Sequence, residues 1–132
     1  MPEKPRHRRA EPYVPSILVV DDDPHIRASF RRILEEAGYL VTDAGTGKEA
    51  SNAARDWFFE VMILDLSMPQ DDGFDVIRSV RDWAPGLKIL VVSEFMAGRM
   101  LPVAAKLGAA ATLNKADASD KLLTEVCGLL QR

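Results

Sequence analysis

The stretch Ile17-Leu18-Val19-Val20-Asp21-Asp22-Asp23-Pro24 decides the fold class of this chain. Its first four residues form a continuous apolar run rich in β-branched side chains, which predicts a parallel strand covered on both faces. Asp23 suits the N-cap of a helix, and Pro24 suits the first helical position. The stretch therefore predicts a buried strand that ends on acidic residues and leads directly into a helix.

The same alternation of strand and helix continues to the end of the chain. The predicted strands cover residues 17–20, 40–43, 61–65, 87–93 and 110–114. The predicted helices cover residues 24–37, 47–55 with Thr46 as the cap, 74–84 and 118–130, with a further helix that begins near Pro102 and ends at Gly108. With right-handed crossovers, five strand–helix repeats predict an α/β fold with a doubly wound five-stranded parallel sheet and five helices.

The composition is that of one globular domain. A length of 132 residues suits one ordinary domain and is too short for two. The net charge of −3 gives no reason to expect nucleic acid or a membrane surface as a partner. The apolar runs are too short to span a bilayer, and the single cysteine has no internal disulfide partner. We expect a cytoplasmic protein, monomeric or weakly dimeric, that binds neither nucleic acid nor membrane.

Residues 1–15 differ from the rest of the chain. They combine four prolines with three arginines and contain almost nothing to bury. We therefore expect a disordered, basic and proline-rich N-terminal tail at residues 1–15 and one folded domain at residues 16–132. A basic docking arm for an acidic partner is the alternative interpretation of the tail.

Polar residues stand at the ends of four predicted strands. Asp21 and Asp22 follow the first strand, Asp65 ends the third, Ser93 ends the fourth, and Lys115 follows the fifth. These ends lie side by side in a parallel sheet, so we expect the side chains to share one pocket. Crowded carboxylates favour a shared cation, and oxygen ligands suit Mg²⁺ or Mn²⁺. A free carboxylate beside such a cation and a lysine has the parts for phosphoryl transfer, with an aspartyl phosphate as product.

Two motifs resemble the receiver domains of response regulators, the CheY-like family. The first is the opening stretch as far as Arg27, and the second is Leu64-Asp65-Leu66-Ser67-Met68-Pro69 followed by Asp72-Gly73-Phe74. Ser93 and Lys115 also stand at the spacings that the family uses. The resemblance covers residues 16–130 and implies the flavodoxin-like strand order 2-1-3-4-5.

The resemblance implies a metal site and a phosphoacceptor. Asp65 would accept the phosphoryl group and would also contact the metal, Mg²⁺ or Mn²⁺. Asp22 would be a direct metal ligand, and Asp21 would hold a metal-bound water. The backbone carbonyl of Ser67 would complete the ligands that the protein supplies.

The resemblance also implies the signalling function. Lys115 would pair with a phosphoryl oxygen, and Ser93 would hydrogen-bond the phosphoryl group. The donor would be a sensor histidine kinase or a histidine phosphotransfer protein. An unknown output partner would bind the face formed by the fourth helix, the fifth strand and the fifth helix. Such a protein is not an enzyme in the usual sense, because it catalyses only its own phosphorylation and dephosphorylation.

The sequence departs from the family pattern beside Ser93 and before Lys115. The family tends to have a small residue after the serine, and this chain has Glu94 followed by Phe95, two positions that we expect to modulate the reaction. Glu94 adds bulk and negative charge, which predicts slower phosphoryl entry or a resting-state pair with Lys115. Thr112 stands where the family often has a Tyr or Phe that turns inward on activation, so output would need other contacts.

The third departure is Ala116, the residue after Lys115. The family commonly has a proline there, joined by a cis peptide bond. A cis bond to alanine costs about 3–4 kcal/mol. A trans bond would reorient Lys115 unless the loop compensates, so Ala116 is a further modulating position.

Other functions remain open at this point. The main alternative is an atypical receiver that acts as a phosphorylation-independent protein-binding module. A phosphatase of the haloacid-dehalogenase type would need an aspartate where Ser67 stands, and a flavodoxin would need Gly, Ser or Thr amides where the acidic loop stands. No output domain is found within the 132 residues. We therefore expect either a receiver that acts by docking or a piece of a longer regulator.

Overall fold

The computed structural model describes residues 13–68, 73–94, 105–106 and 108–132. The elements are β1 (Ser16–Val20), α1 (Pro24–Glu36), β2 (Leu40–Ala44), α2 (Gly47–Asp56), β3 (Val61–Asp65), α3 (Gly73–Trp83), β4 (Lys88–Ser93), β5 (Ala111–Asn114), a 3₁₀ turn η1 (Lys115–Asp117) and α5 (Ala118–Leu130). The strands form one parallel sheet in the order β2-β1-β3-β4-β5. The predicted fold class and strand order are confirmed.

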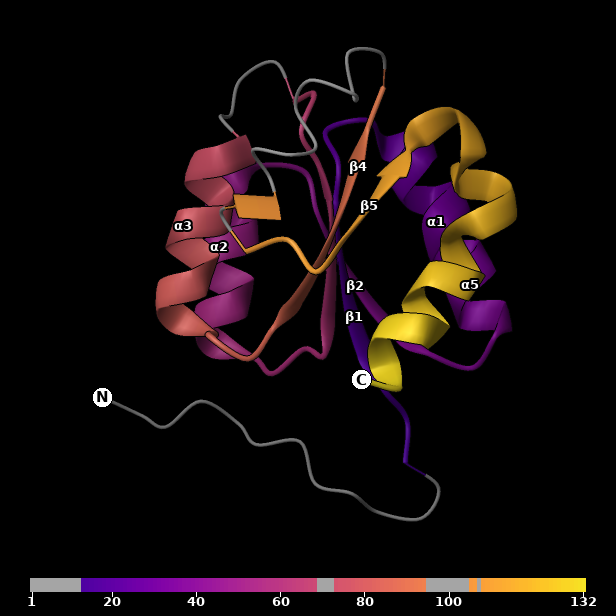
Figure 1. The fold of residues 1–132 in the computed structure, drawn as a ribbon, viewed down its shortest axis with the longest axis horizontal. Coiled ribbons are helices and arrows are strands. Elements are labelled where there is room, and N and C mark those ends of the chain that lie inside the picture. Colours follow the sequence, from indigo (N-terminus) through magenta and orange to yellow (C-terminus); the bar gives the residue numbers. More distant parts are fainter. Residues whose placement is uncertain (1–12, 69–72, 95–104, 107) are drawn as a thin grey trace.

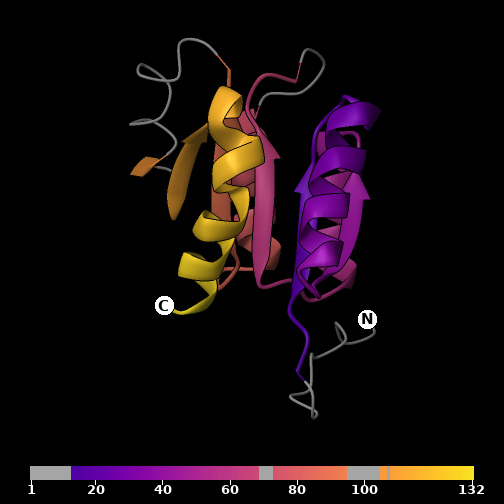
Figure 2. The same ribbon diagram turned by 90° about the vertical axis from the view of Figure 1, so that its right-hand side faces the viewer.

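Helices cover both faces of the sheet. Figure 1 shows the sheet edge-on, with α2 and α3 on one face and α1 and α5 on the other. In Figure 2 the helices α1 and α5 lie in front of the sheet, and the strand arrowheads point to the same edge. Alternate residues of β1 and β3 enter the two cores: Leu18 and Leu64 pack toward α2 and α3, and Ile17 and Ile63 toward α1 and α5. This two-sided burial explains why the central strands are apolar throughout.

Local capping residues set the helix starts as predicted. The backbone N–H of His25 donates to Oδ1 of Asp23 at 2.8 Å, and Pro24 is the first residue of α1. The N–H of Glu49 donates to Oγ1 of Thr46 at 3.1 Å at the start of α2. Gly38 takes a φ of +96° just beyond α1, a left-handed conformation that favours glycine.

Two details after β4 bear on the predictions. Of the predicted fourth helix, only Ala105 and Lys106 are described within a helix; Pro102 and the modulating residue Phe95 lie outside the described residues. The described part of the chain has four α-helices. The 3₁₀ turn η1 between β5 and α5 was not expected, and it begins at Lys115.

Near its start, the described chain is tied to the rest of the domain at Pro15 and Ser16. The N–H of Leu40 donates to the carbonyl of Pro15 at 3.0 Å, and the N–H of Ser16 donates to Oε1 of Glu60 at 3.0 Å. Within the ranges that the structure describes, no helix is both long and apolar enough to cross a bilayer.

Candidate functional site

The buried polar side chains gather at the carboxyl edge of the sheet. Asp21, Asp65 and Ser93 are the buried polar residues of the described chain, with exposed fractions of 1%, 2% and 3%. Asp65 and Ser93 are the last residues of β3 and β4, and Asp21 follows β1 directly. Since Val20 pairs with Leu64 in the sheet, the next residues, Asp21 and Asp65, fall side by side.

Lys115 joins the two buried carboxylates. Its Nζ lies 3.0 Å from Oδ2 of Asp21 and 3.1 Å from Oδ2 of Asp65, and its side chain is 12% exposed. The lysine reaches the pocket because it follows β5, whose last residue, Asn114, pairs with Ser93. The structure therefore brings together the acidic residues and the lysine that the sequence singled out.

Three carboxylates are close enough to hold one cation. Asp21, Asp22 and Asp65 each offer an oxygen, and these oxygens lie within 4.8 Å of one another. Asp21 and Asp65 are buried, and Asp22 is exposed. Oδ2 of Asp21 is buried, and the Lys115 ammonium lies 3.0 Å from it. Since the three carboxylates share the single charge of that ammonium, negative charge remains in the cluster, which fits a hard divalent cation such as Mg²⁺ or Mn²⁺.

The loop after β3 is held against Asp65. The N–H of Ser67 donates to Oδ1 of Asp65 at 2.8 Å, and the N–H of Leu66 donates to the carbonyl of Val92 at 3.0 Å. A Cβ on Gly73 would lie 2.6 Å from Cδ2 of Leu66 and 3.1 Å from its Cα. Glycine at the start of α3 therefore permits the close approach of the helix start to Leu66.

Burial and charge in the pocket raise the pKa values of Asp21 and Lys115. Burial raises the pKa of Asp21, and the charge of Asp65 adds to this, against the hydrogen bond from Asp23 and the contact with Lys115. Burial alone would lower the pKa of Lys115, but Asp21 and Asp65 together outweigh it, and that pKa is raised. The lysine therefore stays protonated and neutralises part of the acidic cluster.

Glu94 stands at the mouth of the pocket. Its Oε1 lies 3.9 Å from Nζ of Lys115, and its side chain is 53% exposed. With Ile26, Asn114, Lys115 and Ala116 it lines an open cavity of about 490 Å³ beside the acidic cluster. Its carboxylate is therefore close to the ammonium that joins the two buried aspartates.

The two other modulating positions lie on β5 and just beyond it. Thr112 is half-buried and pairs with Val91 in the sheet. The N–H of Ala116 donates to the side-chain Oδ1 of Asn114 at 3.0 Å. A proline at this position has no N–H to donate, so it could not form this hydrogen bond. Lys115 reaches both aspartates from this capped turn.

Sequence reasoning missed two residues that shape the pocket. Asn114 caps the turn that carries Lys115. Arg27, in α1, donates from Nη1 to the backbone carbonyl of Asp21 at 2.6 Å. Asparagine directly before a turn is a local signal for a cap, so Asn114 could have been predicted. The direction of the long Arg27 side chain has no comparable local signal.

Comparison with known proteins agrees with this architecture. The family model for the response regulator receiver domain matches residues 17–127. The response regulator MprA of Mycolicibacterium vanbaalenii is 38% identical over 122 residues, which cover 88% of this chain and 50% of that protein. A CheY-like receiver domain protein from Methanospirillum hungatei has a TM-score of 0.84 at 28% identity, covering 89% of this chain and 94% of that chain.

A further solved structure bears on the pocket. It is a response regulator from Burkholderia pseudomallei with a phosphorylated aspartic acid, a calcium ion and citrate. Its TM-score is 0.73 at 29% identity, covering 86% of this chain and 71% of that chain. The curated relatives are longer, and the chain spans 24% of the length of one and 50% of another. From the matched family model, the shared sequence and the shared fold, the chain belongs to the response regulator receiver domain family, a family of signalling domains and not of conventional enzymes.

Proposed function

We propose that this receiver domain accepts a phosphoryl group on Asp65 and thereby changes its binding to a partner. One observation carries the proposal. The carboxylate of Asp65 is buried at a strand end, 3.1 Å from the Lys115 ammonium and beside the Asp21 and Asp22 carboxylates. This arrangement gives a nucleophilic oxygen, a fixed cation and ligands for a second cation within one pocket.

The chain's own residues would divide the reaction between them. An oxygen of Asp65 forms a bond to phosphorus while the P–N bond of a phosphohistidine donor breaks. The imidazole leaves with the electron pair of that bond and takes up a proton. The Lys115 ammonium attracts the phosphoryl oxygens, and the Ser93 hydroxyl donates a hydrogen bond to one of them. Water later cleaves the acyl phosphate, which returns Asp65 and inorganic phosphate.

Mg²⁺ or Mn²⁺ would be held at the same edge of the sheet. Asp22 and Asp65 would ligate it directly, Asp21 through a water, and Ser67 through its backbone carbonyl. When bound, the metal neutralises negative charge on the phosphoryl oxygens. The proximity of the three carboxylates, whose oxygens lie within 4.8 Å of one another, supports this assignment. The structure of the Burkholderia response regulator also contains a calcium ion.

The same proposal covers the cellular context. The donor is a sensor histidine kinase or a histidine phosphotransfer protein, and the receiver works in the cytoplasm as a monomer or weak dimer. Phosphorylation shifts an existing equilibrium between two conformations. An output partner recognises the phosphorylated conformation at the face formed by the fourth helix, β5 and α5. Residues 1–15 serve as a tail to the domain at residues 16–132.

A second candidate is a binding module that works without phosphorylation. The observation that favours it is the contact between Glu94 and Lys115 at 3.9 Å. A carboxylate in that position offers the lysine a partner of the kind that a phosphoryl group would otherwise supply. The two functions differ in whether Asp65 is ever modified.

The test is phosphorylation by a small donor. Incubation with Mg²⁺ and phosphoramidate should add one phosphoryl group, measured as an increase in intact mass at short times. Asp65→Asn should show no increase, because it lacks the nucleophilic oxygen. Beryllofluoride, which mimics the phosphoryl group, should bind the wild type in the presence of Mg²⁺.

Asp82→Asn is the matched control, because Asp82 is an exposed acid on α3 away from the pocket. It should gain the same mass as the wild type. If folded wild type gains no mass and binds no beryllofluoride, the phosphoacceptor proposal is wrong and the binding module takes its place. A phosphoryl adduct that also forms in Asp65→Asn would show that another residue is modified.

A further inference from the structure

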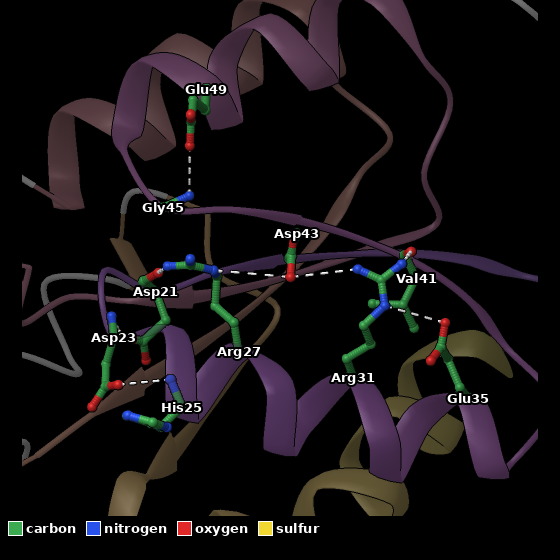
Figure 3. A network of polar contacts seen from close by, with 10 residues as sticks. All are labelled: Asp21, Asp23, His25, Arg27, Arg31, Glu35, Val41, Asp43, Gly45 and Glu49. Carbon is green, nitrogen blue, oxygen red and sulfur yellow. Dashed lines mark hydrogen bonds and ion pairs between the residues drawn. The ribbon is translucent and has the colours of Figure 1, made fainter.

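Arg27 connects α1 to the acidic loop at residues 21–23. Its Nη1 donates to the backbone carbonyl of Asp21 at 2.6 Å, and its Nε lies 3.9 Å from Oδ2 of Asp43. Figure 3 shows the guanidinium between Asp21 and Asp43. The Arg27 side chain is 21% exposed. Arg27 therefore contacts the backbone of the acidic loop and not the side-chain carboxylates of Asp21 or Asp22.

The contact from Arg27 completes the fixation of Asp21. The N–H of Asp21 donates to the carbonyl of Ala44 at 3.2 Å, and its Oδ1 accepts from the N–H of Asp23 at 2.9 Å. Arg27 binds the carbonyl, so the N–H, the carbonyl and Oδ1 of Asp21 all have partners in the loop and β2 region. The remaining polar atom, Oδ2, lies in the pocket beside Lys115. The Asp21 carbonyl belongs to the planar peptide that leads to Asp22. A fixed peptide plane restricts the position of the Asp22 Cα and therefore the positions that its carboxylate can reach.

The surroundings of Arg27 are shaped to hold the guanidinium. A Cβ on Gly45 would lie 3.0 Å from Nη1 of Arg27 and 3.4 Å from its Cζ, so glycine leaves room for the side chain. Asp43 is shared with Arg31, whose Nη1 lies 3.4 Å from the same carboxylate oxygen. Arg31 also donates from Nη2 to the carbonyl of Val41 at 2.9 Å, as Figure 3 shows. The network therefore anchors Asp43 on β2 and aligns it with Arg27.

We propose that Arg27 is a positioning residue that preorganises Asp21 and Asp22 for the divalent cation without touching it. The inference rests on the proposed function, because it assumes that these carboxylates hold a metal. Groups that orient metal ligands affect metal affinity although they lie outside the ligand set. A pure charge effect would act in the opposite direction, because removing a nearby positive charge favours a bound cation. The sign of the change in Mg²⁺ affinity therefore separates positioning from charge.

The experiment measures the dissociation constant of Mg²⁺ by calorimetric titration, with no phosphodonor present. Arg27→Met should weaken Mg²⁺ binding by about tenfold, the lower end of the effect of removing an outer-shell partner. Arg27→Lys keeps a donor and the charge, and it should recover part of the loss. Gly45→Ala should cause a smaller loss in the same direction, because its Cβ crowds the guanidinium.

Arg32→Met is the matched control. It removes an exposed arginine of α1 that pairs with Glu36, with 3.8 Å between Nε and Oε1, and that has no part in the Arg27–Asp43–Arg31 network among the described residues. It should leave the Mg²⁺ dissociation constant unchanged. Thermal unfolding without Mg²⁺ gives the structural readout. A positioning role predicts that Arg27→Met binds Mg²⁺ more weakly while its melting temperature without Mg²⁺ stays close to that of the wild type.

Two results would overturn the assignment of Arg27. They are an unchanged Mg²⁺ affinity in Arg27→Met, whatever its metal-free melting temperature, and a tighter Mg²⁺ affinity. Asp22→Asn separates this inference from the proposed function. If wild type binds Mg²⁺ and Asp22→Asn does not, the metal site stands whatever Arg27→Met shows. If the wild type itself binds no Mg²⁺, the metal part of the proposed function fails together with this inference.

Discussion

At the scale of single residues, Glu94 is the side chain that most distinguishes this pocket. Its carboxylate is 3.9 Å from the Lys115 ammonium and about half exposed. An exposed ion pair of this kind contributes about 1 kcal/mol or less, so Glu94 tunes the pocket and does not close it. In the proposed reaction, its negative charge would also repel an anionic phosphodonor that approaches Asp65.

We predict that Glu94→Gln accelerates phosphorylation by acetyl phosphate. A barrier lower by about 1 kcal/mol corresponds to a rate about fivefold higher. The rate of mass increase at a fixed acetyl phosphate concentration measures it. The gain should shrink at high salt, because mobile ions screen an exposed charge.

Glu36→Gln provides the control for that experiment. Glu36 is an exposed acid at the end of α1, where it pairs with Arg32. Its replacement should leave the phosphorylation rate as in the wild type. Equal rates for wild type and Glu94→Gln would show that Glu94 does not limit access to Asp65.

At the scale of elements, α1 and α5 are joined on their shared face of the sheet. Tyr39, just after α1, forms a hydrogen bond with Sγ of Cys127 in α5, with an oxygen–sulfur distance of 3.2 Å. This hydrogen bond, followed by burial, raises the pKa of Tyr39 from 10.0 to about 12. The pair therefore links the two helices most firmly while the tyrosine is protonated.

We predict an alkaline loss of stability that depends on Tyr39. Above pH 10 the unfolded chain releases the Tyr39 proton while the folded chain still holds it, up to its pKa of about 12. The unfolded state is then favoured, so the free energy of unfolding falls as the pH rises through this window. Below pH 10 both states are protonated and the contribution is complete. Urea unfolding at several pH values measures the fall.

Tyr39→Phe removes the titrating group and should make this part of the pH dependence disappear. Cys127→Ala should bring the pKa of Tyr39 in the folded chain closer to 10, because the hydrogen bond with Cys127 is the main cause of its raised pKa. The pH range over which stability is lost should narrow accordingly. The prediction is wrong if wild type and Tyr39→Phe lose stability in parallel between pH 10 and 12.

At the scale of the whole molecule, the pocket and the folded domain are linked by ligand binding. A cation that binds only the folded state stabilises it, by about 2.7 kcal/mol at one hundred times its dissociation constant. The carbonyl of Pro15 accepts a hydrogen bond from the N–H of Leu40 at the start of β2. The domain proposed at residues 16–132 should therefore keep both its stability and its response to Mg²⁺ without the tail.

We predict that deletion of residues 1–12 changes neither the melting temperature nor its increase with Mg²⁺. Thermal unfolding with and without Mg²⁺ measures both quantities. Asp22→Asn, tested in the full chain, should lose the Mg²⁺ response and keep the fold, because its side chain is exposed. A melting temperature several degrees lower after the deletion would place residues 1–12 within the folded unit.

Much of the fold could be predicted from local patterns. The caps Asp23 and Thr46 form the hydrogen bonds that their residue types predict, since a cap needs contacts only within one turn. Helix α5 begins at Ala118 and ends at Leu130, as its apolar spacing indicated. The first helix was predicted to reach residue 37; α1 ends at Glu36, and Ala37 is its exposed C-cap. Helix ends depend on how the chain turns toward β2, which the spacing alone does not specify.

The sequence by itself therefore determined the alternating fold and the composition of the pocket. Parallel strands share one carboxyl edge, so Asp21, Asp65 and Lys115 had to meet once the strands were recognised. The tertiary structure alone decided which atoms touch. Arg27 reaches the Asp21 carbonyl past Gly45, and Tyr39 meets Cys127 across 88 positions of the chain. Such contacts depend on the rotamers of long side chains and on the packing of distant elements, and neither leaves a periodic signal in the sequence.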